Sequence, residues 1–180
     1  MKTGASLVFL ISLALHAQQP QFTQDGKLMR PDDYREWIFL SSGLGMTYGA
    51  LGTGERTDHP LFDNVFVNPP AYKSFLATGT WPDKTIFVLE VRVSGSKSSI
   101  NTGGHYQDEI VGVQAAVKDV KRFPGNWGYF GFKKAADPVE VLPQTAACYA
   151  CHSKNGAVEN TFVQFYPTLL PVAKAKGTLK

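Results

Sequence analysis

Two cysteines and a histidine stand within five consecutive residues near the end of this 180-residue chain. Cys148 and Cys151 are separated by two residues, His152 follows directly, and the chain contains no other cysteine. On a helix this spacing places the thiols one turn apart, where each can bond a vinyl group of one porphyrin. The histidine then lies under the iron. The C-x-x-C-H pattern therefore predicts one covalent haem c, attached at Cys148 and Cys151, with His152 as the proximal iron ligand.

Two other uses of the cysteine pair fit less well. A C-x-x-C redox disulfide is typical of a βαβ unit, and the sequence shows no such pattern. A zinc site needs a fourth ligand that the motif does not supply. Most small electron-transfer c cytochromes are helical and carry the motif near the mature N-terminus, whereas here it stands near the C-terminus.

The first 17 residues predict an export signal. Lys2 precedes a run of about ten apolar residues, and the small residue Ala17 stands at the expected cleavage point. The run is too short to span a bilayer, which needs ~20 apolar residues. We expect cleavage near Ala17, a single haem c domain over residues 18–180, and a periplasmic or secreted protein that is not held in a membrane.

The formal charge of +3 is scattered along the sequence. It gives no case for binding nucleic acid or an anionic membrane. A weak basic tail, formed by Lys174, Lys176 and Lys180, is interpreted as a solvated helix end. The aromatic content of 12% suits a chain that encloses a porphyrin.

Hydrophobic patterns predict strands for most of the chain between the lead-in and the motif. Runs rich in β-branched and aromatic residues indicate four strands, at residues 62–67, 85–93, 108–117 and 126–132. In the second strand, Glu90 and Arg92 share one face, and Phe87 and Leu89 share the other. The glycine-rich stretch 41–59 has no clear period and is predicted to be a loop.

Helices are expected at three places around these strands. A short helix is predicted over residues 32–37, and a longer one begins at Pro69, is capped by Asn68 and ends at Gly79. A helical pattern also covers residues 162–173, where two prolines should kink or delay the helix. The fold class is therefore α+β, mainly antiparallel β-sheet with flanking helices and C-terminal haem c attachment.

Several short motifs resemble the cytochrome P-460 family and the related beta-type cytochromes c′. They cover nearly all of the mature chain: Tyr34-Arg35-Glu36-Trp37, Asn68-Pro69, Tyr72, Val117-Lys118-Asp119, Lys121-Arg122-Phe123, Gly125-Asn126-Trp127, Phe162 and Phe165-Tyr166-Pro167. The resemblance implies a mostly antiparallel sheet with flanking helices. It also implies a five-coordinate haem that is bound by the motif histidine and has an open distal face. Related proteins form dimers, so a homodimer is a further expectation.

Two activities occur in this group, and the residues distinguish them. One subgroup oxidises hydroxylamine and carries a covalent bond from a lysine to the porphyrin edge; the other binds nitric oxide under an apolar distal cap. The resemblance places Leu89 at the position of that lysine, and leucine has no amine. Lys84 points to the opposite strand face about 16 Å away, and Lys73 is predicted to be a surface residue.

The second distinguishing position is acidic in the oxidising subgroup and falls on Gln114 here. An amide cannot act as a general base near neutral pH. Asp108 and Glu109 stand at the polar start of their strand and are expected to face solvent. The sequence therefore argues against an efficient hydroxylamine oxidase, with Leu89 and Gln114 as distal-pocket residues.

The leading hypothesis is a five-coordinate haem c that binds a small gaseous or N-oxide ligand such as nitric oxide, transfers electrons to an unidentified redox protein, or does both. Phe87 is expected to shape the pocket with Leu89. One alternative is an electron carrier with a sixth iron ligand from Met46, His59 or His105. The other is an enzyme, a hydroxylamine or nitric oxide oxidoreductase or a weak peroxidase. By charge alone, Arg92 and Arg122 are candidate partners of the haem propionates, although solvent exposure is expected for each.

Overall fold

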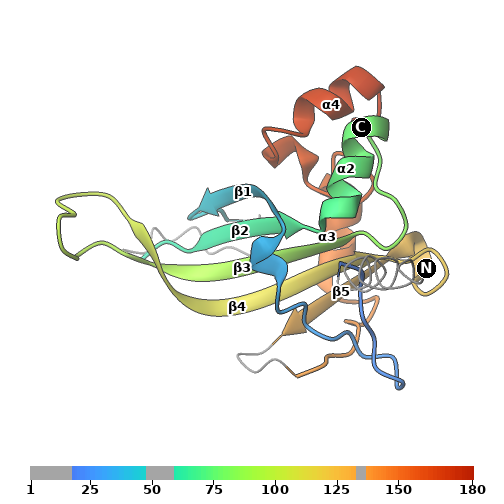
Figure 1. Ribbon diagram of the computed structural model, residues 1–180, viewed down its shortest axis with the longest axis horizontal. Helices are drawn as coiled ribbons and strands as arrows, with labels where there is room; N and C mark the ends of the chain where they lie inside the picture. Colours follow the sequence, from blue (N-terminus) through green and yellow to red (C-terminus); the bar gives the residue numbers. More distant parts are fainter. Residues whose placement is uncertain (1–17, 48–58, 133–136) are drawn as a thin grey trace, which may run out of the picture.

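The computed structural model describes residues 18–47, 59–132 and 137–180; the predicted signal, residues 1–17, lies outside them. A single five-stranded antiparallel sheet forms its centre, and each strand pairs with its neighbours in sequence (Figure 1). The strands are β1 (Ile38–Leu44), β2 (Phe62–Val67), β3 (Ile86–Gly95), β4 (Tyr106–Lys118) and β5 (Trp127–Phe132). Three α-helices accompany the sheet: α2 (Pro69–Thr78), α3 (Ala147–Asn155) and α4 (Leu170–Lys176). The α+β fold class is confirmed.

Hydrophobic side chains are buried on both faces of the sheet. Towards the helices, Phe87 packs with Phe75 of α2 and Leu169 near the start of α4. On the other face, Ile86 and Val88 pack against the N-terminal segment. The members of this second core that precede the sheet are Leu28, Tyr34 and Trp37. Because successive side chains of β3 point to opposite faces of the sheet, this strand contributes side chains to two separate hydrophobic cores.

The predicted loop at 41–59 is partly wrong. Ser41 to Leu44 continue β1, which pairs with β2 through a register shift between Phe39 and Ser41. This strand lies at the edge of the sheet, so one side chain face and one backbone edge remain open to solvent. Polar and glycine residues are tolerated there, and for this reason the hydrophobic pattern of the sequence does not predict this part of the strand.

The helix from Pro69 is confirmed, and Asn68 occupies its N-cap position, where its backbone carbonyl accepts from the N–H of Tyr72. Its side chain makes no capping hydrogen bond to the helix. Instead, the amide of buried Asn68 donates to the Gln18 carbonyl at 2.8 Å and accepts from the Ile86 backbone N–H at 3.0 Å. Asn68 therefore joins the N-terminal segment to the start of β3, while Gly79 ends α2 with a φ of +76°.

The C-terminal helical pattern is broken, as its prolines predicted. Residues 162–173 hold one 3-10 turn, η4 (Val163–Phe165), and the first half of α4. The predicted helix at 32–37 is one 3-10 turn, η1 (Tyr34–Glu36). In the described part of the chain no helix has both the length and the apolar character needed to cross a membrane.

Candidate functional site

The three motif residues lie together on α3. Cys148 and Cys151 are both free and half-buried, one turn apart, and His152 follows on the same helix. Ala147–Asn155 form this helix without a proline or glycine to break it. The local structure therefore has the spacing that the motif predicts for haem c attachment.

The imidazole of His152 is fixed through its Nδ1 atom. Nδ1 lies 2.8 Å from the Asn160 carbonyl oxygen. A carbonyl can only accept, so Nδ1 carries the proton and Nε2 keeps the lone pair that binds a metal. Burial lowers the pKa of His152 despite this hydrogen bond, which favours the neutral ring.

A tight turn after α3 brings the Asn160 carbonyl to the histidine. Glu159 and Asn160 both have positive φ, +45° and +33°. Gly156 allows the close approach, because a Cβ there would lie 2.7 Å from the His152 carbonyl and 2.8 Å from the backbone of Asn160 and Thr161. Thr161 is held in turn by Trp81, whose indole N–H donates to its hydroxyl at 2.9 Å.

Two aromatic rings flank the imidazole. The centroids of Tyr129 and Phe162 each lie 4.5 Å from that of His152. Tyr129 also packs edge-on against Tyr149 at 4.8 Å. These contacts leave the ring of His152 little freedom to turn.

One cavity adjoins both α3 and the helix-facing side of the sheet. Its space, including open solvent at the mouth, is about 930 Å³. Cys148 and His152 line it, together with Leu89 and Gln114, which are direct cross-strand partners on β3 and β4. The predicted distal-pocket residues thus share a cavity with Cys148 and His152, whereas Cys151 is not part of its wall.

The walls of this cavity suit a flat, mainly apolar group with one metal. Phe87, Ala116, Phe162 and Tyr166 supply apolar surface. Tyr129 also lines the cavity, and its hydroxyl is buried and has no hydrogen-bond partner among the described residues. Burial raises its pKa, so it stays protonated and can donate to a bound group. Two thiols, a neutral imidazole and an orphaned hydroxyl together fit a haem.

Of the proposed sixth ligands, only Met46 reaches this cavity. Its Sδ atom lies against Gly43 of β1, and both residues line the cavity wall. His59 and His105 are exposed, and neither is part of the wall. Met46 is therefore the one member of this set that the fold brings into the same cavity as His152.

The other charged candidates lie elsewhere. Lys84 is paired with Asp119, and Lys73 is exposed on α2. Neither propionate candidate lines the cavity: Arg92 binds Glu90, and Arg122 stacks over the Phe22 ring at 4.0 Å.

Asp63 is a cavity residue that sequence reasoning missed. It lies on β2 opposite Val91, on the same face as Leu89. The two-residue period of the strand Phe62–Val67 could have found it, since Asp63 and Val65 share a face. The cavity therefore holds a carboxylate, although at a different position from Gln114.

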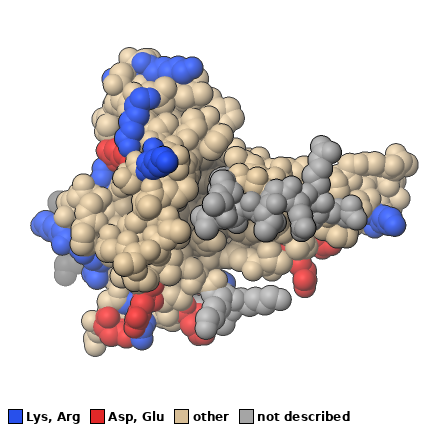
Figure 2. Space-filling view, turned by 180° about the vertical axis from the view of Figure 1, so that it is seen from behind, with Lys and Arg blue, Asp and Glu red and all other residues tan. Residues whose placement is uncertain are grey.

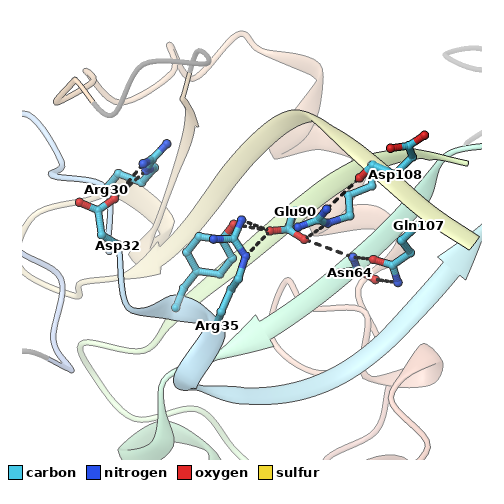
Figure 3. A network of polar contacts seen from close by, with 9 residues as sticks. Arg30, Asp32, Arg35, Asn64, Glu90, Gln107 and Asp108 are labelled. Atoms are coloured by element: carbon cyan, nitrogen blue, oxygen red, sulfur yellow. Dashed lines mark hydrogen bonds and ion pairs between the residues drawn. The ribbon is translucent and has the colours of Figure 1, made fainter.

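A polar network occupies the opposite face of the sheet (Figure 3). The buried carboxylate of Glu90 accepts from Arg35 at 2.6 Å, from Arg92 at 2.5 Å and from the hydroxyl of Tyr34. Asn64 adds a longer contact and is joined to Gln107. This network ties η1 to β3 directly behind the cavity wall.

Comparison with known proteins agrees with this arrangement. The family model described as Cytochrome P460 matches residues 31–163, which is most of the chain and includes α3. No curated protein matches the chain. Within the described residues, no group of three or more His, Cys, Asp or Glu side chains could hold a metal ion by itself.

Proposed function

The chain belongs to the cytochrome P460 family, so its cofactor is a haem, and we propose that this protein is an exported mono-haem cytochrome that binds small neutral ligands. The haem is attached at Cys148 and Cys151, and His152 is the iron ligand. The mature protein begins near Gln18 and works in the periplasm or outside the cell. Nitric oxide is the ligand we favour, with one-electron exchange to a redox protein as the accompanying activity.

One observation carries this proposal: Leu89 and Gln114 lie side by side on β3 and β4, in the wall of the cavity that His152 also lines. By family resemblance, these are the positions of the cross-linking lysine and of the acidic residue in the hydroxylamine-oxidising subgroup. A leucine and an amide provide neither the covalent bond nor the general base. Apart from Asp63, Gln114 and Tyr129, the wall is mainly apolar, and such a surface favours neutral diatomics over charged ligands.

The side chains around His152 prepare it for this role. The Asn160 carbonyl fixes the tautomer and orientation of the imidazole, and the flanking rings of Tyr129 and Phe162 restrict its rotation. When bound, the haem supplies an iron that coordinates a diatomic ligand and exchanges one electron. The buried hydroxyl of Tyr129 would be available to donate to a polar group bound in the site, and Phe87 would add apolar surface to the wall.

The test is the absorption spectrum of the purified holoprotein, ferric and ferrous, before and after nitric oxide. We expect a high-spin five-coordinate spectrum, a clear shift of the ferrous bands with nitric oxide, and no red-shifted ferrous band of the cross-linked type. A spectrum indifferent to nitric oxide would overturn the proposal. A red-shifted ferrous band would show that Leu89 does not decide the subgroup.

A second candidate is a six-coordinate electron carrier, which the position of Met46 favours. In that case the resting spectrum is low-spin, and Met46→Leu converts it to high-spin. Met29→Leu is the matched control, because Met29 is 47% exposed and outside the cavity wall. A high-spin wild-type spectrum, unchanged by Met46→Leu, excludes the methionine ligand.

A third candidate, a hydroxylamine or nitric oxide oxidoreductase, is favoured by Asp63 in the cavity. We expect hydroxylamine turnover no faster than that of a nonspecific haem protein, and no effect of Asp63→Asn. Fast turnover that disappears in Asp63→Asn would make this protein an enzyme with its base on β2.

A further inference from the structure

Positive charge is concentrated in one part of the molecule. We define the basic lobe as residues 69–82 and 145–180, which include α2, α3, η4 and α4. It carries five lysines and one acidic residue, whereas the rest of the chain carries 13 Lys or Arg and 14 Asp or Glu. All five lysines are exposed: Lys73, Lys154, Lys174, Lys176 and Lys180. Figure 2 shows basic side chains spread over this lobe and acidic ones mostly on the lower part of the molecule.

The only acidic side chain of the basic lobe does not pair with these lysines. Glu159 pairs at 2.7 Å with Lys118, which comes from β4 outside the lobe. The lobe therefore has a formal side-chain charge of +4, and no salt bridge of the described residues involves any of its five lysines. The sequence suggested only a solvated helix end, because it could not show that Lys73 and Lys154 join the C-terminal lysines.

The basic lobe includes the helix that carries the haem motif. Lys154 is two residues beyond His152 on α3, and the ammonium of Lys180 lies 3.3 Å from the Ser153 carbonyl. The backbone N–H of Lys180 also donates to Ala157 at 2.8 Å, which holds the C-terminus beside the end of α3. The positive charge is therefore next to the redox site rather than remote from it.

A line of aromatic rings leads from the histidine to the surface of the same lobe. Phe162 lies 4.5 Å from His152, and Phe165 follows at 6.4 Å between centroids. Phe165 is 47% exposed although it also lines the cavity. Phe165 is thus an exposed ring beside the cavity, in the same lobe as five exposed lysines, and apolar and charged groups are combined in this way in transient protein interfaces.

We propose that the basic lobe is the docking surface for an acidic one-electron-transfer protein. This inference rests on the proposed haem function. Opposite charges steer such a partner to the lobe, so its reduced centre approaches the haem where Phe165 is exposed. One electron then leaves the partner, which is oxidised, and reduces the ferric haem to the ferrous state. No bond forms or breaks in the protein.

The experiment measures reduction of the ferric holoprotein by a reduced plant-type [2Fe–2S] ferredoxin, an acidic protein used as the probe. Stopped-flow rates are compared for wild type, K154E/K174E and K97E/K121E. Both double variants change the net charge equally, but Lys97 and Lys121 are exposed residues outside the lobe. Reduction potentials of all three proteins are measured, so that altered driving force is not mistaken for altered docking.

At low ionic strength we expect K154E/K174E to react at least ~10-fold more slowly, and K97E/K121E to remain within about 2-fold of wild type. The difference should disappear near ~1 M salt, where charges are screened within about 3 Å. Equal rates in both variants at unchanged potential, or no reduction of wild type by ferredoxin, would overturn the docking surface. Failure of the nitric oxide shift would instead overturn the proposed ligand-binding function, whatever the ferredoxin rates.

Discussion

Glu90 is a single carboxylate on which two arginines and a tyrosine converge, with its side chain only 3% exposed. Burial alone would raise its pKa, but hydrogen bonds from Arg92, Tyr34 and Arg35 outweigh burial and lower the pKa to about 2, from an ordinary 4.5. The ionised carboxylate therefore stabilises the fold fully above pH 4.5. This contribution is lost as the pH falls from 4.5 towards 2.

We expect Glu90→Gln to lower the free energy of unfolding by about 3 kcal/mol at pH 7, because the amide leaves the charges of Arg35 and Arg92 without their partner. Between pH 4.5 and 2, stability of the variant should fall less steeply than that of wild type. Urea denaturation at pH 7 and pH 3 measures both effects. Asp32→Asn is the control, since Asp32 is 71% exposed in its pair with Arg30 and should change stability little. Equal losses in the two variants would contradict a special role for Glu90.

Individual residues also show how far the sequence could predict the site. Cys148, Cys151 and His152 were found by spacing alone, because a covalent haem needs local geometry that one helix provides. The assembly of Leu89, Asp63 and Met46 around one cavity depends on pairing between strands, which spacing in the sequence does not encode. The hydrogen bond from His152 to the Asn160 carbonyl could not be predicted for another reason. Every residue has a backbone carbonyl, and only the conformation of the turn brings this one to the imidazole.

At the scale of elements, the turn after α3 holds the imidazole of His152, the proposed iron ligand, through the Asn160 carbonyl. We expect Gly156→Ala to displace the Asn160 carbonyl, since the new Cβ would meet backbone atoms at 2.7 and 2.8 Å. Overpacking of this kind costs about 1–3 kcal/mol. The iron–histidine stretching frequency in the resonance Raman spectrum of the ferrous protein should fall as the Nδ1 hydrogen bond weakens. Gly103→Ala, where a Cβ meets nothing within 4 Å, should change neither quantity.

Two glycines with left-handed backbone at helix ends allow the cost of backbone strain to be distinguished from the cost of steric crowding. Gly79 ends α2 at a φ of +76° and Gly177 ends α4 at +67°, so alanine is strained at both. At Gly79 the Cβ would also lie 2.6 Å from the Cβ of Lys176, whereas at Gly177 it meets nothing within 4 Å. We expect Gly177→Ala to cost about 1 kcal/mol and Gly79→Ala about 1–3 kcal/mol more, measured by urea denaturation. Equal costs would show that α2 and α4 separate easily.

The helices and strands that were predicted well are those whose own residues show a characteristic pattern or characteristic end residues. β2 to β5 alternate or are rich in β-branched residues, and α2 is bounded by Pro69 and Gly79. β1 was partly missed because Ser41 to Leu44 are held by pairing to β2 rather than by burial. Asn68 was assigned to the helix on local preference, but the longer-range bonds to Gln18 and Ile86 prevail.

For the whole molecule, export and haem attachment can be tested in one measurement. We expect intact-mass spectrometry of the protein from the periplasm or medium to give the mass of residues 18–180 plus one haem. The haem should remain bound after denaturation in acid, because thioether bonds to Cys148 and Cys151 hold it. The Cys148→Ala/Cys151→Ala variant should release its haem under the same conditions. A mass that includes residues 1–17 would contradict signal cleavage.

Alternation along β3 has a consequence for how such a protein can change over generations. Phe87 and Leu89 face the cavity, while Ile86, Val88 and Glu90 hold the scaffold behind it. A substitution of Leu89, which belongs to neither hydrophobic core, alters the chemistry offered to a ligand and leaves the contacts of Ile86, Val88 and Glu90 in place. The chemistry of this cavity can therefore be changed at one position of β3 while the packing behind the sheet is retained.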